Sequence, residues 1–137
     1  MIQLNTNELV MSNYLRITDA VLRVGDEELV HEMLFMLDSS VEKDWFEFEK
    51  NFNINQYTLA ANILHGMKGT IPIFSDKKTE EIMQKTETLL RSTVNELELK
   101  KTVDELSFQM LGFRTELKLW VKRQNQSPFK PAVNSIA

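Results

Sequence analysis

The strongest constraint on the fold is an apolar repeat with alternating spacings of four and three residues near the C-terminal end of the chain. The repeat consists of Leu99, Val103, Leu106, Met110, Phe113, Leu117 and Trp120. These spacings keep the side chains on one face of an α-helix, because a helix has about 3.6 residues per turn. A face of this length needs other helices to cover it. The repeat therefore predicts a long helix packed in a helical bundle.

The first half of the chain predicts two more helices. Apolar residues at positions 10, 14, 17 and 21 indicate a helix over residues 7–24. Gly25 is its expected stop, because glycine accepts the left-handed conformation just after a helix. Asp26 is the expected N-cap of a long helix over residues 27–50. The apolar stripe of that helix is Val30, Met33 or Leu34, Leu37, Val41, Trp45 and Phe48.

The middle of the chain predicts two further helices before the long last one. A helix that carries His65 should end near Ile71, because Pro72 lacks the N–H group that would continue it. Ser75 and Asp76 are expected to cap a helix over residues 77–91. Thr93 and Glu96 have the spacing of a capping box for the last helix, in which Gly112 is expected to mark a close packing contact.

Together these patterns predict an all-α protein. Four glycines and three prolines are too few for a turn-rich β architecture. Amphipathic helices with short connections pack most simply as an antiparallel up-and-down four-helix bundle, here with an additional N-terminal helix. We expect one domain over residues 1–125 and a flexible C-terminal tail over residues 126–137, which contains two of the prolines.

Composition excludes several classes of function. The absence of cysteine removes disulfides and cysteine-based metal centres, and the two histidines have no spacing typical of a metal site. A net charge of −4 argues against nucleic-acid binding. The first residues lack signal-peptide features, and the longest apolar run, residues 33–37, is too short to cross a membrane. We expect a cytoplasmic, monomeric protein, and the initial Met1 and the tail favour a free-standing one.

Residues 59–70 carry the candidate chemistry. On a helix, one side of this stretch gathers the apolar residues Ala60, Ile63, Leu64, Met67 and Ile71. The other side gathers Thr58, Ala61, Asn62, His65, Lys68, Gly69 and Pro72. We therefore expect His65 to stand in solvent, with small or polar neighbours and a cation one turn further on. Such an imidazole suits transient attack on a phosphoryl group.

The sequence His65-Gly66-Met67-Lys68-Gly69-Thr70 resembles the His-x-x-Lys-Gly signature of histidine-containing phosphotransfer (HPt) domains. Members of that family pass phosphoryl groups between receiver domains. Residues 25–29 resemble the glycine-and-acid start of the family's second helix, and residues 78–90 resemble the helix that packs beside the histidine helix. The resemblance extends over residues 25–120.

The resemblance implies a role for each matching residue. His65 corresponds to the phospho-accepting histidine, and Lys68 to the lysine that steadies phosphoryl oxygens. Gly69 corresponds to the glycine that lets a partner approach. Glu87 corresponds to a glutamate or glutamine that hydrogen-bonds the other ring nitrogen, and Gln84, one turn earlier, is the substitute for it. Partner docking is expected on Ala61, Asn62, Gly66, Gly69 and Pro72.

The resemblance thus implies a phosphorelay carrier in two-component signal transduction. His65 would accept the group from a receiver aspartate, in a response regulator or hybrid histidine kinase, and pass it to another receiver. The sequence has no Gly-rich phosphate loop, so neither ATP binding nor autokinase activity is expected. No cofactor is expected, and Mg²⁺ would come with the receiver.

Two positions depart from the family pattern. The family usually has a glycine or another small residue where this chain has Pro72, and again near Ser75. These departures affect the choice of receiver partner more than the chemistry at His65. They keep open an alternative function, a non-phosphorylated helical adaptor that docks on receiver domains or other signalling proteins.

Overall fold

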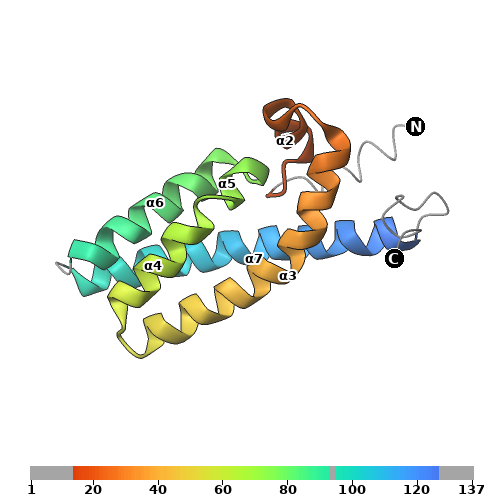
Figure 1. Cartoon of the computed structure of the whole chain (residues 1–137). Helices are drawn as coiled ribbons and strands as arrows, with labels where there is room; N and C mark the ends of the chain where they lie inside the picture. Colours follow the sequence, from red (N-terminus) through yellow and green to blue (C-terminus); the bar gives the residue numbers. More distant parts are fainter. Residues whose placement is uncertain (1–13, 93–94, 127–137) are drawn as a thin grey trace.

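The computed structural model of the chain describes residues 14–92 and 95–126. This part of the chain is all-α, as predicted, and its β pairing is limited to an isolated bridge between Leu15 and Ser75. The helices are α2 (Ile17–Val24), α3 (Glu27–Asn53), α4 (Tyr57–Met67), α5 (Ile71–Phe74), α6 (Lys77–Ser92) and α7 (Glu96–Gln126) (Figure 1).

The four longest of these helices lie around a shared core. Helix α3 contacts α4 and α7, and helix α6 contacts the same two helices. Helix α2 packs on α3 and α5, and α5 in turn contacts α6 (Figure 1). Helix α4, which carries His65, is therefore supported by a helix on each of two sides.

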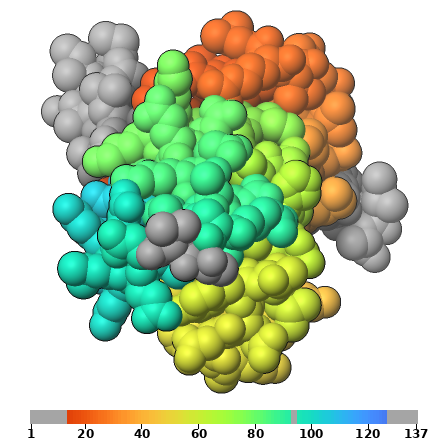
Figure 2. All heavy atoms as spheres, turned by 90° about the vertical axis from the view of Figure 1, so that its left-hand side faces the viewer, coloured from red at the N-terminus to blue at the C-terminus, as the bar shows by residue number. Residues whose placement is uncertain are grey.

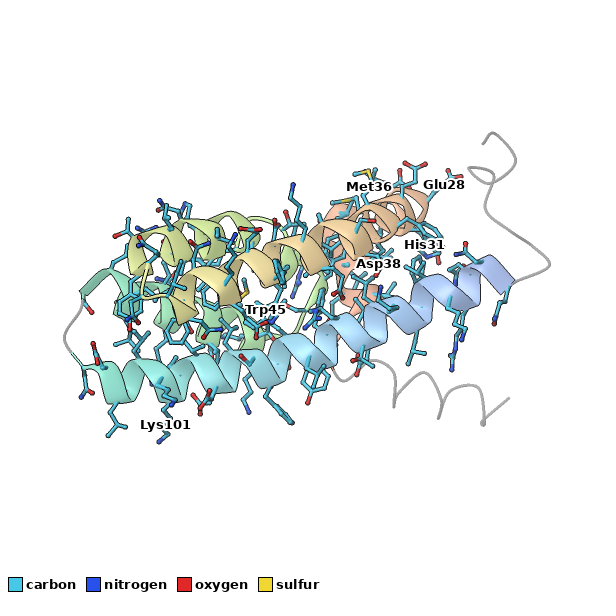
Figure 3. The ribbon with its side chains drawn as sticks, turned by 90° about the horizontal axis from the view of Figure 1, so that it is seen from below. Glu28, His31, Met36, Asp38, Trp45 and Lys101 are labelled. Atoms are coloured by element: carbon cyan, nitrogen blue, oxygen red, sulfur yellow. The ribbon has the colours of Figure 1, made fainter. Side chains whose placement is uncertain are left out.

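The predicted apolar stripes of α3 and α7 are confirmed. The buried residues of the α3 stripe are Val30, Leu34, Leu37, Val41, Trp45 and Phe48. All members of the α7 repeat are buried except Trp120, which is half-buried and packs its ring against Phe35 and His31. Figure 3 shows α3 and α7 side by side, with Met36 on the outer surface of α3. The 3.6-residue period thus located the core faces of both helices.

Residues 14–16 of the predicted N-terminal helix are not helical. Helix α2 starts at Ile17, because the residues before it make hydrogen bonds to distant parts of the chain. The N–H groups of Tyr14 and Leu15 both donate to Oε1 of Glu116, each at 2.9 Å, and the N–H of Arg16 donates to the carbonyl of Phe74 at 2.7 Å. These contacts hold residues 14–16 outside the helix. Residues 7–13 of the predicted helix lie outside the described residues.

Gly112 makes the close packing contact that the sequence predicts. A Cβ atom at this position would lie 2.4 Å from the ring of Tyr14, well inside van der Waals contact. The aromatic ring of Tyr14 therefore covers α7 where that helix has no side chain. The ring also packs edge-on against Phe108, with 6.4 Å between centroids.

Most of the predicted helix ends are confirmed. Gly25 ends α2 with a φ of 86°, the left-handed region that favours glycine. Asp26 accepts from the N–H of Leu29 at 3.1 Å, and Asp76 accepts from the N–H of Thr79 at 2.9 Å. The capping box cannot be followed, since Thr93 lies outside the described residues, as does the predicted tail beyond residue 126. Instead Asn95 accepts from the N–H of Glu98 at 3.0 Å.

The predicted end of the histidine helix is wrong. Helix α4 ends at Met67, and a turn over residues 68–70 separates it from α5. The turn closes with short-range bonds from the N–H of Gly69 to the carbonyl of Gly66 and from Thr70 to Met67, both 3.1 Å. Pro72 lies in the first turn of α5, where a missing N–H leaves no bond unmade. Pro72 therefore begins a helix rather than ending one.

Two helices, α3 and α7, exceed the length that a bilayer requires, but neither has a sufficiently apolar segment. Among the described residues, we find no helix that combines the length and the apolar content needed to span a membrane.

Candidate functional site

His65 projects from the outer side of α4. The inner side of this helix is formed by Ala60, Ala61, Leu64 and Met67, all of which are buried. The His65 side chain keeps 70% of its surface exposed, which confirms the exposure that the sequence predicts. Helix α6 adjoins α4, and their surfaces meet in the space-filling view (Figure 2). Side chains of α6 therefore lie beside the imidazole.

The nearest of these side chains is Glu87, which is only 7% exposed. Nδ1 of His65 lies 3.1 Å from Oε2 and 3.4 Å from Oε1 of this carboxylate. Nζ of Lys68 donates to Oε1 at 2.8 Å, and Nε of Arg91 donates to Oε2 at 3.0 Å. The buried carboxylate of Glu87 thus contacts three side chains. His65 and Lys68 come from α4 and the turn after it, and Arg91 comes from α6 itself.

Glu87 is ionised at neutral pH. Burial by itself raises the pKa of Glu87, because it disfavours the charged carboxylate. Hydrogen bonds from Lys68 and Arg91 favour the charged form, and together with the nearby charge of Lys68 they hold the pKa of Glu87 below its ordinary value. An ionised carboxylate can only accept hydrogen bonds. Its contact with His65 therefore requires a proton on Nδ1, and in the neutral imidazole the lone pair then lies on Nε2.

Lys68 lies one turn after His65 and points to the same carboxylate. Its side chain is 20% exposed, and Nζ donates both to Glu87 and to Oε1 of Gln84. Gln84 was the alternative to Glu87 as the partner of the imidazole. The structure places Glu87 beside His65 and places Gln84 beside Lys68.

Arg91 and Asn62 extend the cluster, although the sequence did not lead us to expect their contact. The guanidinium of Arg91 donates to Glu87 and also reaches across to α4, where Nη2 donates to Oδ1 of Asn62 at 3.1 Å. The spacing of four residues between Glu87 and Arg91 is typical of an ion pair on a helix surface and could have indicated the first contact. The second contact joins residues 29 positions apart and has no such local pattern.

Of the five residues expected to dock a partner, three are exposed, one is half-buried and one is buried. Asn62, Gly66 and Gly69 are exposed. Ala61, however, is completely buried and cannot contact a partner. The physical reason is that α4 packs against both α3 and α6, so its buried face is wider than the single apolar stripe suggested. Pro72 is half-buried and belongs to α5 rather than to α4.

The surface beside the imidazole is open at the backbone. A Cβ atom added to Gly66 would meet nothing within 4 Å. At Gly69 an added Cβ would lie 3.3 Å from the carbonyl oxygen of Gly66, a tight contact within the turn itself. Another protein can therefore approach the α4 backbone closely next to His65.

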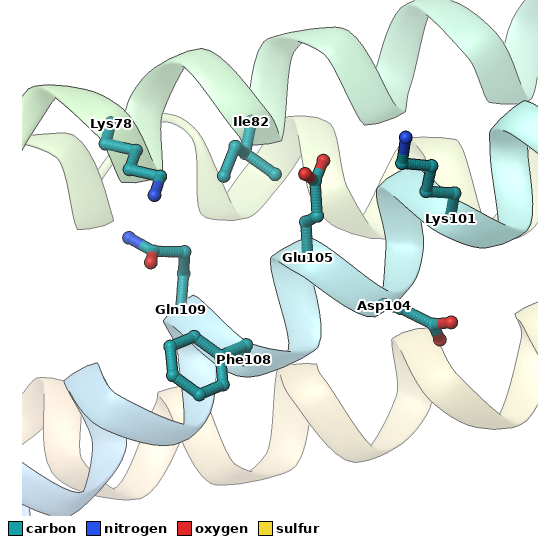
Figure 4. Close-up of a pocket in the computed structure, with 7 residues that line it drawn as sticks. All are labelled: Lys78, Ile82, Lys101, Asp104, Glu105, Phe108 and Gln109. Atoms are coloured by element: carbon teal, nitrogen blue, oxygen red, sulfur yellow. The ribbon is translucent and has the colours of Figure 1, made fainter.

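A hollow of about 330 Å³ lies elsewhere, between α6 and α7 (Figure 4). Its lining residues are Lys78, Ile82, Lys101, Asp104, Glu105, Phe108 and Gln109. Lys78 is nine residues from Glu87, which corresponds to the opposite side of α6. None of the predicted site residues lines this hollow.

Within the described ranges, no group of three or more His, Cys, Asp or Glu side chains could hold a metal ion. Comparison of the chain with protein-family models, with curated proteins and with solved structures finds no match. The function is therefore argued from the geometry around His65 and from the HPt-like sequence motif.

Proposed function

We propose that this chain is a phosphorelay carrier of the HPt type. It accepts a phosphoryl group on His65 from a receiver-domain aspartate and passes it to another receiver. The observation that carries this proposal is the 3.1 Å contact between Nδ1 of His65 and the buried carboxylate of Glu87. With Nδ1 engaged there, Nε2 becomes the nucleophile on an imidazole that is 70% exposed.

The accepting step forms one bond and breaks one. The lone pair of Nε2 attacks phosphorus, the bond between phosphorus and the aspartyl oxygen breaks, and the aspartate leaves with the electron pair as a carboxylate. The ring of His65 then carries substituents on both nitrogens and a positive charge. The Glu87 carboxylate stabilises that charge and holds the ring in place, as an orienting carboxylate does for a nucleophile or base. Donation to a second receiver reverses these bond changes.

Lys68 supplies positive charge for the transferred group. Phosphoryl transfer asks little covalent chemistry of a protein beyond positioning and charge neutralisation. An ammonium group acts as a compact point charge toward phosphoryl oxygens. Lys68 and His65 both contact the carboxylate of Glu87, and this shared partner keeps the ammonium of Lys68 close to the imidazole.

The fold and the surface fit the same proposal. We assign α3, α4, α6 and α7 to an antiparallel up-and-down four-helix bundle, with α2 as the additional N-terminal helix. Asn62, Gly66 and Gly69 form the receiver-docking face, with Pro72 at its border. Mg²⁺ and the acyl phosphate come with the receiver, and the exchange takes place in the cytoplasm.

The test is the intact mass of the chain after mixing with receiver domains charged by acetyl phosphate. The expected result is a gain of one phosphate that is lost in acid, as phosphoramidates are. Because it lacks the nucleophile, His65→Gln should gain none while keeping the helical circular dichroism of the wild type. Labelling of His65→Gln would refute the assignment. Receiver binding without any gain in mass would indicate the non-phosphorylated adaptor instead.

A further inference from the structure

Arg91 bridges the two helices that form the candidate site. It follows Glu87 by one turn of α6, and its Nε donates to Oε2 of Glu87 at 3.0 Å. Nη2 of the same guanidinium lies 3.0 Å from that oxygen and also donates to Asn62 on α4 at 3.1 Å. Oε2 is also the oxygen nearer to Nδ1 of His65. Arg91 thus fixes the position of the oxygen that faces the imidazole.

Lys68 has two hydrogen-bond acceptors in the unphosphorylated chain. Nζ donates to Oε1 of Glu87 at 2.8 Å and also to Gln84. Phosphoryl oxygens on Nε2 of His65 would compete with Glu87 and Gln84 for the three N–H groups of this ammonium. Giving up Glu87 removes one cation from a carboxylate that is 7% exposed, and a buried carboxylate without a cation is strongly disfavoured.

We propose that Arg91 is a positioning residue for phosphoryl transfer, an inference that rests on the function proposed above. Arg91 keeps Glu87 paired and in contact with His65 while Lys68 turns to the phosphoryl group. A guanidinium suits this role because its planar fork reaches two acceptors at once, here Glu87 and Asn62. A lysine at position 91 could pair with Glu87 across one turn but could not bridge to α4.

The inference can be tested without a receiver domain, using phosphoramidate as the donor. Nε2 of His65 forms a bond to phosphorus as the P–N bond of phosphoramidate breaks and ammonia leaves. The rate of labelling is followed by intact mass over a range of phosphoramidate concentrations. We expect the maximal rate for Arg91→Gln to be about tenfold lower, as for the loss of one charge-assisted hydrogen bond in the transition state.

Two further variants test which property of Arg91 matters. One separates its ion pair with Glu87 from its bridge to Asn62, and the other controls for the net charge of the chain. Arg91→Lys restores the charge beside Glu87 without the bridge, and its rate should recover to within about threefold of the wild type. Lys85→Gln removes one positive charge from an exposed position of the same helix, where Lys85 pairs with Glu98 at 3.7 Å. This matched control should label at the wild-type rate.

Each outcome decides the inference. Wild-type rates for Arg91→Gln, or an equal loss in Lys85→Gln, would overturn the role of Arg91 and leave the phosphorelay proposal intact. A wild-type chain that takes no phosphate on His65 from either phosphoramidate or a charged receiver domain would overturn both. If Arg91→Gln loses helical circular dichroism, Asn62→Ala decides instead, because it removes only the anchor of Arg91. We expect about threefold slower labelling for Asn62→Ala, and an unchanged rate would overturn the inference.

Discussion

Nδ1 of His65 and Oε2 of Glu87 lie 3.1 Å apart, although the two residues are 22 positions apart in the sequence and belong to different helices. The imidazole is exposed and the carboxylate is buried. A buried acceptor fixes both the orientation and the tautomer of an exposed ring. The free nitrogen, Nε2, is therefore available to a reactant from solvent.

Replacing Glu87 with glutamine should slow phosphoryl transfer about tenfold. The amide keeps the size of the side chain and one acceptor oxygen, but it loses the charge that stabilises the phosphorylated ring. Charged hydrogen bonds are roughly twice as strong as neutral ones, and about 1.4 kcal/mol corresponds to a factor of ten in rate. Single-turnover transfer from a charged receiver measures the effect. Glu98→Gln, at an exposed acid of α7, is the control, and an unchanged rate for Glu87→Gln would argue against the role of the carboxylate.

Glu87 should also make the free energy of unfolding depend on pH. Its folded pKa lies below the ordinary value of 4.5, so the unfolded chain binds this proton more readily than the folded chain. The stabilisation is therefore complete above pH 4.5 and is lost as the pH falls through the folded pKa. We expect urea denaturation to show a larger advantage of wild type over Glu87→Gln at about pH 7 than at about pH 3.

A second acid with a lowered pKa does not disturb this comparison. Arg114 donates hydrogen bonds to Glu42 and thereby lowers the pKa of Glu42. Glu42 is present in both proteins, so its contribution cancels in the difference. A difference between wild type and Glu87→Gln that stays constant with pH would contradict the prediction.

Two glycine-to-alanine substitutions should change stability in opposite directions. At Gly66, in α4, an added Cβ meets nothing within 4 Å, so Gly66→Ala should stabilise the chain by roughly 0.5–1 kcal/mol through lower backbone entropy in the unfolded state. At Gly112 an added Cβ would meet the Tyr14 ring at 2.4 Å, so Gly112→Ala should destabilise by about 1–3 kcal/mol. Urea denaturation measures both changes in the free energy of unfolding. A less stable Gly66→Ala would contradict the presence of open space at this position.

The glycine at position 66 also links stability to docking. If a receiver uses the open backbone beside His65, Gly66→Ala should be more stable and yet slower in transfer from the receiver. Its labelling by phosphoramidate should be unchanged, because that small donor needs no close approach of another protein.

The sequence predicted those features that depend on local periodicity or on a single residue type. The stripes of α3 and α7 follow the helical period, and every predicted member except Trp120 is buried. Gly25, Asp26 and Asp76 end or begin helices because of conformation or hydrogen bonding within a few residues. The exposure of His65 was predicted in the same way, from the polar side of a helix.

The features that the sequence did not predict depend on contacts between distant residues. Ala61 is buried because α4 packs on two helices. The prediction of a single apolar stripe on α4 did not include the second contact. Residues 14–16 stay outside α2 because Glu116 accepts from the N–H groups of Tyr14 and Leu15, and the carbonyl of Phe74 accepts from that of Arg16. The bridge from Arg91 to Asn62 likewise spans two helices. Pro72 illustrates a different difficulty, because a proline can either end a helix or stand in the first turn of one, and here it stands in the first turn of α5.

Replacing Lys68 with alanine should slow transfer to and from His65 about tenfold while the chain stays folded. The ammonium of Lys68 shares the Glu87 carboxylate with His65, and its removal takes a cation away from the site where the phosphoryl group would be carried. Folding should persist, because Arg91 still pairs with the Glu87 carboxylate. Single-turnover kinetics and circular dichroism test both parts. Lys101→Ala, at an exposed lysine of α7, is the matched control. Unchanged kinetics in Lys68→Ala would remove Lys68 from the mechanism and leave its bond to Glu87 as a purely structural contact.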